Sequence, residues 1–369
     1  MGKAFYFFAA ALFLAAFSPL KAQEFQGVRA NMDDPLDEQI LLDPQYIPNY
    51  RELMRDIVAA FSEYVKNTRP DFYIVAAGGH DLLTRGEWEN DLDELHRAEA
   101  AGAKSDDERF LLKLFSPEEP IAPGTPNRRY IQSINAFLTD NQICGSAPLP
   151  KKTLGILRKY GVSVLDVEHC RTAAKMREAQ TVLAERKIPA HADTDKAARF
   201  DYLDPETKPF LENPDNVASL NDVRNILIMT DTRNYASKGE WVNALTQTNY
   251  DLLIIDPFYK YNQPLTKEDI RRLRYKKLGA RRLVFAVLDI SSAEDTRMYW
   301  EPSWKLKSPA WLRFPSKTRP GAIVVDYWSA PWKGIIGNYF KSIMDLGYDG
   351  IVLQGLDAHK TYEKIIPIN

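Results

Sequence analysis

The apolar residues of the chain form two patterns that alternate along most of its length. In residues 50–67 (YRELMRDIVAAFSEYVKN) they recur every three or four positions, which is the period of an amphipathic helix. Residues 71–79 (DFYIVAAGG) are instead a continuous apolar run closed by glycines, which is typical of a strand buried on both faces. The predicted buried face of the helix consists of Leu53, Met54, Ile57, Val58, Phe61 and Val65.

Apolar runs of the strand type recur along the chain, and helical patterns separate most of them. Parallel strands need long crossover connections, which are usually helices. The alternation therefore predicts an α/β fold, a single-domain (β/α)8 TIM barrel, with a doubly wound open sheet as the alternative. The predicted strands cover residues 72–77, 130–138, 162–168, 225–231, 251–259, 282–290, 322–328 and 350–357.

Three segments interrupt this alternation. Residues 23–47 are acidic and contain proline without a clear period, so we expect a loosely ordered leader before a barrel that spans residues 48–369. Residues 81–127 are charged and rich in proline and glycine, which predicts a long insertion with helical pieces. Residues 188–221 are irregular and polar, which predicts a connector.

The N-terminus has the features of a signal peptide. Lys3 precedes an apolar run, residues 4–17, that is too short for a comfortable membrane span, and small residues follow up to Ala22. We expect residues 1–22 to be removed and the protein to be exported to the periplasm or the extracellular space. No later run is long enough to span a bilayer, so we expect no membrane span in the mature protein.

The composition narrows the class of partner. The chain of 369 residues is 45% hydrophobic and 27% charged, which is ordinary for a globular protein, and its net charge of −2 gives no basic field for nucleic acid. The five histidines show no HExxH or similar spacing, and two cysteines cannot build a zinc ribbon. We therefore predict no metal, no cofactor and no nucleic-acid partner.

Polar residues collect where the predicted strands end, which in a barrel is one mouth and the usual place of the chemistry. Any one of them alone is explained by a helix cap or a turn, but acids recur after most strands. An acidic mouth suits a neutral or cationic substrate, and aromatic residues at the same ends could stack on sugar rings or simply pack under loops. The polar set is Asp140, Asn141, Glu168, His169, Asp231, Asp256, Asp289, Ser291, Ser292, Asp326, Gln354 and Asp357; the aromatic set is Phe258, Tyr259, Tyr299, Trp300, Tyr327 and Trp328.

Two stretches, residues 283–300 (LVFAVLDISSAEDTRMYW) and 324–359 (VVDYWSAPWKGIIGNYFKSIMDLGYDGIVLQGLDAH), resemble the endo-α-1,4-polygalactosaminidase family, glycoside hydrolase family 114. The similarity is closest to its bacterial and archaeal branch, once labelled cysteinyl-tRNA-synthetase-related, and it extends to residues 50–79 and 250–259. The resemblance implies a TIM barrel that hydrolyses α-1,4 linkages of a galactosamine-rich exopolysaccharide. A polysaccharide or oligosaccharide is the partner that it implies.

The order of the parts differs from the family's usual order. There the GYDG strand lies mid-chain and precedes the helix and strand that resemble residues 50–79; here it comes after them. We infer a circular permutation in which the last three strands of the usual barrel, residues 72–77, 130–138 and 162–168, precede the first five. Closed barrels tolerate this because chain termini often lie close together. The strand 162–168 is then expected beside the strand 225–231.

Carried over residue by residue, the family pattern is altered where its chemistry lies. Gln354 stands where the family has an aspartate on its fifth strand, Ser291–Ser292 replace a Gly-Glu pair, and Asp140 is the nearest match to a glutamate on the seventh strand. Asp256 and Glu168 keep acids on the second and eighth strands. Glu294, Arg297, Tyr299 and Trp300 match the family.

These substitutions leave three hypotheses open. Hydrolysis could continue with Asp256 and Asp140 as the carboxyl pair and Glu168 as support, because glycosidases ordinarily use two carboxyl groups. The barrel could instead bind carbohydrate without hydrolysing it, since the amide of Gln354 can act neither as acid nor as nucleophile. It could also be a scaffold that binds another protein. The predicted ligand-binding residues are Asp231, Tyr259, Asp289, Ser292, Glu294, Arg297, Trp300, Asp326, Trp328, Gln354 and Asp357.

The strand order also places the two cysteines near each other. Cys144 follows the strand 130–138 and Cys170 follows the strand 162–168, and these strands would be neighbours with both cysteines on one rim. Export permits a disulfide between them, and two separate buried thiols are the alternative.

Overall fold

The computed structural model describes residues 42–102, 105, 107–108, 121–195, 199–203, 208–317, 319 and 321–368. The predicted signal peptide and most of the leader lie outside the described residues, as does part of the predicted insertion. At the end of the leader, the 3-10 helix η1 spans Pro44–Tyr46.

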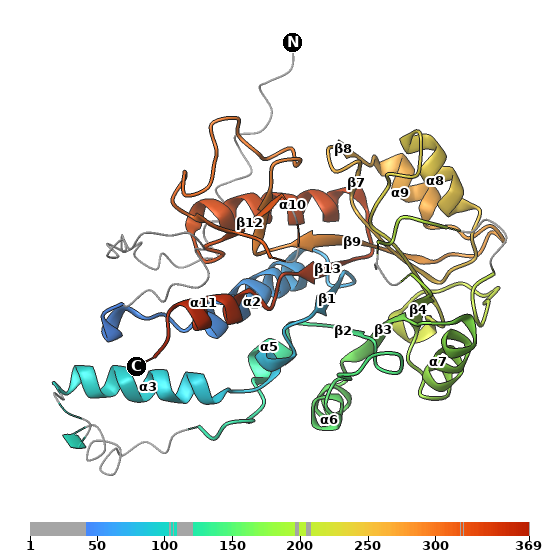
Figure 1. Cartoon of the computed structure of the whole chain (residues 1–369). Coiled ribbons are helices and arrows are strands. Elements are labelled where there is room, and N and C mark those ends of the chain that lie inside the picture. Colours follow the sequence, from blue (N-terminus) through green and yellow to red (C-terminus); the bar gives the residue numbers. More distant parts are fainter. Residues whose placement is uncertain are drawn as a thin grey trace.

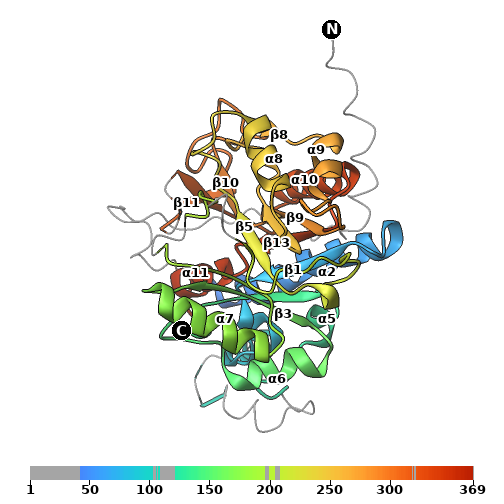
Figure 2. The same cartoon turned by 90° about the vertical axis from the view of Figure 1, so that its right-hand side faces the viewer.

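Eight parallel strands form one sheet that curves into a nearly closed barrel with helices around it (Figures 1 and 2). The spatial order β4-β3-β2-β1-β13-β9-β6-β5 makes each barrel strand a neighbour of the next one along the chain. The first strand also pairs with the last, Val75 standing beside Val352. This confirms the α/β TIM-like barrel. The strands are β1 (Tyr73–Ala77), β2 (Ala136–Asp140), β3 (Ser163–His169), β4 (Ala190–Asp193), β5 (Ile226–Met229), β6 (Leu252–Ile255), β9 (Leu283–Asp289) and β13 (Gly350–Gln354).

The ring has a seam between β4 and β5, where the described residues show no strand pairing. A side chain bridges it: the backbone N–H of Ile228 on β5 donates a hydrogen bond of 3.3 Å to Nδ1 of His191 on β4. A parallel ladder would use evenly spaced backbone bonds at this place. The barrel is therefore closed here by an imidazole and by packing.

One predicted barrel strand was wrong. Within residues 322–328, β12 (Ala322–Val325) forms an antiparallel three-stranded sheet with β10 (Ser292–Glu294) and β11 (Leu312–Pro315), apart from the barrel. The strand that completes the set of eight is β4, which is fourth along the chain and lies inside the segment 188–221 that the sequence predicts to be a connector. All of its residues are half-buried, and its sequence AHAD has no apolar run for the pattern to detect.

The same strand changes the expected neighbours. Because β4 lies between β3 and β5, the strand that contains residues 163–169 does not sit directly beside residues 226–229. Four barrel strands, not three, precede β5. In a barrel whose strands follow one another around the ring, the spatial order of the strands is the same whichever strand comes first in the chain. The strand order therefore does not test the circular permutation, which stays a prediction.

Two other boundaries differ from the prediction. Residues 130–138 do not begin as a strand, because the short helix α5 (Arg128–Ile131) comes first and is capped by the side chain of Asn127, which accepts a hydrogen bond from the amide of Tyr130. In the run 251–259, β6 ends at Ile255, and β7 (Phe258–Tyr259) pairs with β8 (Gln263–Pro264) in a small hairpin.

The helices surround the strands, with α8, α9 and α10 on one side and α6 and α7 on the other (Figure 1). The predicted face of α2 is confirmed, since Met54, Ile57, Val58, Phe61 and Val65 are buried and Leu53 is half-buried. None of the described helices is long and apolar enough to cross a membrane. Their bounds are α2 (Tyr50–Thr68), α3 (Glu87–Ala100), α6 (Lys151–Lys159), α7 (Ala173–Glu185), α8 (Lys238–Thr246), α9 (Lys267–Leu273), α10 (Ala330–Leu346), α11 (Ala358–Ile365) and the 3-10 helices η2 (His80–Leu83) and η3 (Leu220–Asp222).

The apolar side chains of the barrel strands divide between two clusters. One contains alternate strand residues such as Val75, Leu165 and Ile254, and it fills the lumen. The residues between them, such as Ile74 and Leu253, pack with the helices in the larger cluster. Because side chains alternate along a strand, this division fixes which residue at each strand end faces the lumen.

The disulfide expected from the strand order is confirmed. Cys144, in the loop after β2, is bonded to Cys170 just after β3, with Cα atoms 5.2 Å apart. The bond ties together the loops that follow two neighbouring strands at one rim of the barrel.

Removing this disulfide with Cys144→Ala and Cys170→Ala should lower the free energy of unfolding by about 3 kcal/mol, because a closed loop of 26 residues restricts the unfolded chain. Urea denaturation followed by circular dichroism measures the loss. Wild type in reducing buffer is the matched control and should lose a similar amount. Equal stability of wild type in oxidising and reducing buffers would contradict the expectation.

Candidate functional site at the mouth of the barrel

The lumen-facing residues at the carboxyl ends of the strands form a polar layer. Continuing the alternation of the lumen cluster by two residues from Leu138, Val167, Ile254, Val287 and Val352 gives the last lumen-facing position of five strands. These positions are Asp140 on β2, His169 on β3, Asp256 after β6, Asp289 on β9 and Gln354 on β13.

Strand register brings two pairs of this layer side by side. His169 is the Cα partner of Asp193 on β4, and Gln354 is the Cα partner of Asp289. In a parallel pair such partners point to the same face, here the lumen. Gln354 therefore stands beside a carboxylate. No hydrogen bond of its side-chain amide is found within the described residues.

Carboxylates and guanidinium groups alternate in a chain across one side of the mouth. Arg297 binds Asp256 with both nitrogens of its fork, at 3.0 and 2.9 Å, and its Nε donates to Glu294 at 2.8 Å. Arg319, from the turn between β11 and β12, donates to the second oxygen of Glu294 at 3.0 Å and pairs with Asp289. Three acids and two arginines thus form one ion-pair network, in which only Arg319 was not predicted from the sequence.

The electrostatics of the network limit what Asp256 can do. Burial raises the pKa of Asp256, although Arg297 opposes the shift. Burial alone would lower the pKa of Arg297, but its attraction to Asp256 and Glu294 raises that pKa overall. Arg297 therefore stays charged, and its fork occupies both oxygens of Asp256. Asp256 is also 2% exposed, and its Oδ1 accepts a further hydrogen bond from the amide of Phe258, so its carboxylate is largely engaged by the protein.

Asp289 is held by the turn that follows its strand. Its Oδ1 accepts hydrogen bonds of 2.8 Å from the amides of both Ser291 and Ser292. Gly355 makes room for this turn: a Cβ there would lie 2.1 Å from the hydroxyl of Ser291 and 2.8 Å from Oδ1 of Asp289. The two serines that replace the family's Gly-Glu pair therefore contribute backbone amides to the Asp289 carboxylate.

Glu168 is fully buried and directed at the disulfide loop. One of its oxygens accepts from the amide of Ile143 at 2.7 Å and the other from the amide of Cys144 at 2.8 Å. Glu168 also forms, with Cys144 and Cys170, a group of potential metal ligands among the described residues. The two sulfurs are bonded to each other and offer no thiolate, so this group is not suited to a metal while the disulfide is intact.

Asp140 is the exposed carboxylate of the layer. Its Oδ1 accepts a hydrogen bond of 2.7 Å from the side chain of Asn141, whose own oxygen accepts from the amide of His169 at 2.8 Å. Desolvation by the surrounding loops raises the pKa of Asp140; the charge of His169 opposes the shift and that of Glu168 adds to it. Asp140 is therefore the acid of the layer that is most open to a ligand.

Asp231 and Asp357 are engaged at the edge of the mouth. Burial alone would raise the pKa of Asp231, but hydrogen bonds from the amide and side chain of Arg233 lower it overall. Asp357 accepts from the amide of Gly79 at 3.0 Å and pairs with Lys360. Both acids hold their own loops in place.

Asp326 and Trp328 do not follow a barrel strand, because β12 belongs to the small sheet. Burial raises the pKa of Asp326 to about 6, and its Oδ1 accepts from the hydroxyl of Tyr362 at 3.0 Å. The ring of Trp328 packs against the rings of Tyr50 and Tyr362, with centroids 5.3 and 4.7 Å away. They help to attach the small sheet to α2 and α11.

The other predicted aromatic residues are also engaged in packing. Tyr259 is buried and donates its hydroxyl to the carbonyl of Tyr235 at 2.7 Å. Trp300 is half-buried and lies edge-on to Trp304, with ring centroids 5.6 Å apart. The interpretation of these rings as packing under loops therefore fits Tyr259 and Trp328 best. Trp300 and Tyr299 are half-buried, and the hydroxyl of Tyr299 accepts a hydrogen bond of 3.0 Å from the amide of Glu294 in the network.

A second polar group, absent from the predicted site, lies on β3 and β4. Nδ1 of His169 is 2.8 Å from one oxygen of Asp193, and Nε2 of His191 is 3.1 Å from the other. His169 was recognised only as a strand-end residue, and Asp193 and His191 lay in the presumed connector. The alternation in A-H-A-D was the one available indication that a strand could present both side chains to one face.

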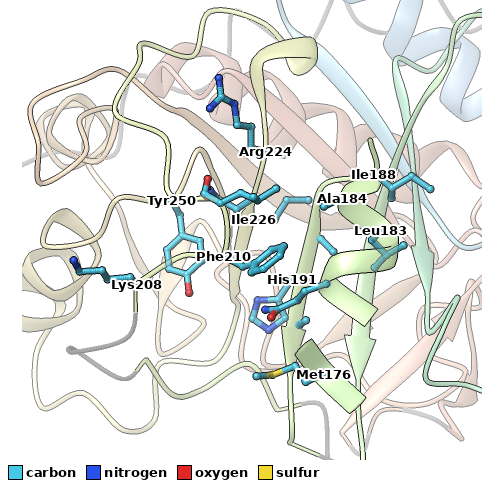
Figure 3. A pocket seen from close by; sticks show the side chains of 15 residues that line it. Met176, Leu183, Ala184, Ile188, His191, Lys208, Phe210, Arg224, Ile226 and Tyr250 are labelled. Atoms are coloured by element: carbon cyan, nitrogen blue, oxygen red, sulfur yellow. The ribbon is translucent and has the colours of Figure 1, made fainter. Parts of the chain in front are cut away.

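A hollow lies beside the seam of the barrel, between α7, β4, β5 and the segment around Phe210 (Figure 3). Its wall is mixed, with apolar side chains of α7 and β5 beside the polar side chains of Lys208 and Arg224. His191 is the one residue that belongs both to this hollow and to the polar group on β3 and β4. No residue of the predicted site lines it.

The fold and the site thus define a (β/α)8-barrel protein with an acid-rich mouth. No protein-family model matches the chain. Uncharacterized proteins from three organisms are similar to parts of it. The one from Deinococcus radiodurans is 28% identical over 122 residues, 33% of this chain and 38% of that protein. The one from Methanocaldococcus jannaschii is 30% identical over 162 residues, 40% of this chain and 45% of that protein.

The third relative, from Thermotoga maritima, is 38% identical over 73 residues, 20% of this chain and 23% of that protein. The chain therefore spans less than half the length of each of these relatives. Their names state no activity.

Replacing Arg297 with alanine should lower the free energy of unfolding by about 3–5 kcal/mol, because it leaves the buried carboxylate of Asp256 without its partner. Urea denaturation measures the loss. Removing both charges with Asp256→Leu and Arg297→Met should recover most of it.

The matched control is Lys175→Ala, which breaks the exposed Lys175–Glu178 pair on α7 and should change stability by less than about 1 kcal/mol. An Arg297→Ala variant as stable as this control would show that the buried pair does not form in solution.

Proposed function

We propose that the protein is an exported, glycoside-hydrolase-like barrel that binds an amino-sugar polysaccharide of the galactosamine type at its mouth, without hydrolysing it by the two-carboxylate route. The resemblance of residues 283–300 and 324–359 to the polygalactosaminidase family supports the ligand class. The N-terminal pattern of residues 1–22 supports export, and the Cys144–Cys170 disulfide is compatible with an oxidising compartment.

One observation carries the choice of binding over hydrolysis. Both oxygens of Asp256 are bound by Arg297, and the neighbouring family acid is replaced by Gln354. A glycosidase needs one carboxyl group that protonates the leaving oxygen and another that attacks or activates water. An amide can take neither role, and Asp256 is buried and must weaken its bonds to Arg297 before it can take either.

The remaining open groups fit a cationic sugar. The exposed carboxylate of Asp140 and the unpaired amide oxygen of Gln354 are acceptors for the ammonium and hydroxyl groups of galactosamine. The network itself carries three carboxylates against two arginines and so adds negative charge to the mouth. A free amino group is therefore preferred over an N-acetyl group.

Hydrolysis by Asp256, Asp140 and Glu168 receives less support from the geometry. Glu168 would have to release two backbone amides, and Asp256 would have to leave Arg297. Circular permutation relative to the family remains part of the proposal. A collinear comparison of a permuted chain can cover only part of it, and matched shares of 20–40% of this chain are compatible with that.

Isothermal titration calorimetry with galactosamine oligomers tests the proposal. Wild type should bind them at least about tenfold more tightly than N-acetylgalactosamine oligomers, because an ammonium group is attracted to the acidic mouth. Asp140→Asn and Gln354→Ala should each weaken binding by a similar factor. Asp345→Asn, at an exposed ion pair on α10, is the control and should leave the affinity unchanged.

A reducing-end assay on the same oligomers tests the absence of hydrolysis. Wild type should release no new reducing ends, whereas Gln354→Asp restores an acid at the family position and should gain measurable release. Turnover by wild type that disappears in Asp256→Asn would contradict the binding-only proposal. Failure to bind any of the oligomers would contradict the ligand class.

A further inference from the structure

His169 is positioned as a ligand-contacting residue, although nothing in the family pattern assigns it a role. Its side chain follows Leu165 and Val167 on the lumen face of β3, so it points into the mouth. Asp193 is its register partner on β4, and the carboxylate lies 2.8 Å from Nδ1. Phe200 packs against the ring with a centroid distance of 5.2 Å. The imidazole is therefore fixed from one side.

The hydrogen-bond chain behind His169 fixes where its protons are. The amide of Ile228 can only donate, so Nδ1 of His191 accepts and carries no proton. His191 then holds its proton on Nε2 and donates it to Asp193. The other oxygen of Asp193 accepts from Nδ1–H of His169 and from the amide of Asp195 at 3.0 Å. His169 must therefore gain or lose its second proton at Nε2.

That second nitrogen is open to a ligand. Among the described residues no hydrogen-bond partner of Nε2 of His169 is found, and the side chain is 11% exposed. A histidine whose Nδ1–H is held by a carboxylate and whose Nε2 has no protein partner can either donate or accept at that atom.

Three carboxylates are the charges that act on His169 most strongly, and Arg199 pairs with one of them, Asp195. Asp193 from β4, Asp140 from β2 and Asp195 from the loop after β4 face it, and Phe200 adds no charge. The hydrogen bond from Asp193 is the largest influence and raises the pKa of His169; burial opposes it, and the charges of all three aspartates add to the shift. Protonated His169 in turn offsets the negative charge of Asp140.

We propose that His169 is a ligand-binding residue of the mouth and that its loss of a proton makes room for a cationic amino sugar beside Asp140. The class of ligand rests on the proposed function, whereas the position and hydrogen bonds of His169 are independent of it. The proton leaves Nε2 for solvent, and the freed lone pair accepts a hydrogen bond from an ammonium or hydroxyl group of the sugar. Binding is thereby coupled to proton release.

Calorimetry with galactosamine oligomers at several pH values tests this coupling. The affinity of wild type should rise from about pH 5.5 toward neutral pH as His169 loses its proton, and it should fall again where the sugar amine, which resembles an α-amino group with a pKa of about 7.7–8.0, loses its own proton. Titrations in buffers of different ionisation enthalpy should show about half a proton released per site at the midpoint and up to about one below it. A merely structural histidine would release none.

Variants distinguish the role of His169 from that of Asp193, which holds its Nδ1–H. His169→Gln should lose the rise in affinity between about pH 5.5 and neutral pH and should release no proton there, because glutamine does not titrate. Asp193→Asn should move the midpoint to lower pH, since it removes the carboxylate that favours the charged imidazole. His96→Gln, on α3, is the matched control and should keep the wild-type pH dependence.

The outcomes distinguish the two proposals. Binding that does not depend on pH, or an unchanged pH step in His169→Gln, overturns the role of His169 and leaves the proposed function standing. Absence of binding at every pH overturns both. A titration of the imidazole resonances by NMR in the free protein adds a separate check: a wild-type midpoint that Asp193→Asn does not lower would also overturn the proposal.

Discussion

The alternation of side chains along eight parallel strands is the constraint on which the site depends. It sends one residue of each neighbouring pair into the lumen and the other toward the helices, and it continues unbroken to the strand ends. Asp140, His169, Asp256, Asp289 and Gln354 face one another because each lies two residues beyond an apolar lumen residue. The mouth is polar because the apolar layers beneath it end at the same level.

The carboxylates of this mouth are chemically alike, but they differ in how far their oxygens are open to a ligand. Asp256 and Asp289 are bound by arginines and amides, whereas Asp140 remains open at the rim. A carboxylate in a low-dielectric site acts as acid, base or nucleophile only if its oxygens are free at the moment of reaction. Counting acids at strand ends therefore overestimates the chemistry of the barrel, and the partners of each acid decide what it can do.

Much of the fold could be predicted from apolar periodicity. The helix at residues 50–67, seven of the eight barrel strands and the disulfide agree with the structure. The strand Ala190–Asp193 could not be found in this way because it lacks an apolar run. The run at 322–328 was assigned to the barrel because its strand is as apolar as a barrel strand, although it forms the centre of the small sheet.

Most residues of the candidate site were predicted from the sequence, but the contacts between them were not. Asp256, Glu294 and Arg297 were named from the sequence, yet their union with Arg319 depends on a turn that begins far along the chain, after β11. The role of His169 depends on Asp193, which lies in the strand that the pattern did not detect. Contacts between side chains of different loops leave no periodic trace in a sequence.

The seam at His191 gives the barrel a property that a fully laddered ring does not have. An eight-stranded ring held by backbone bonds is closed by the backbone alone, whereas this one is joined at the seam by the hydrogen bond from the amide of Ile228 to an imidazole. The same imidazole is tied through Asp193 to the lumen-facing His169. The wall of the barrel and the titratable group of its mouth therefore share one chain of hydrogen bonds.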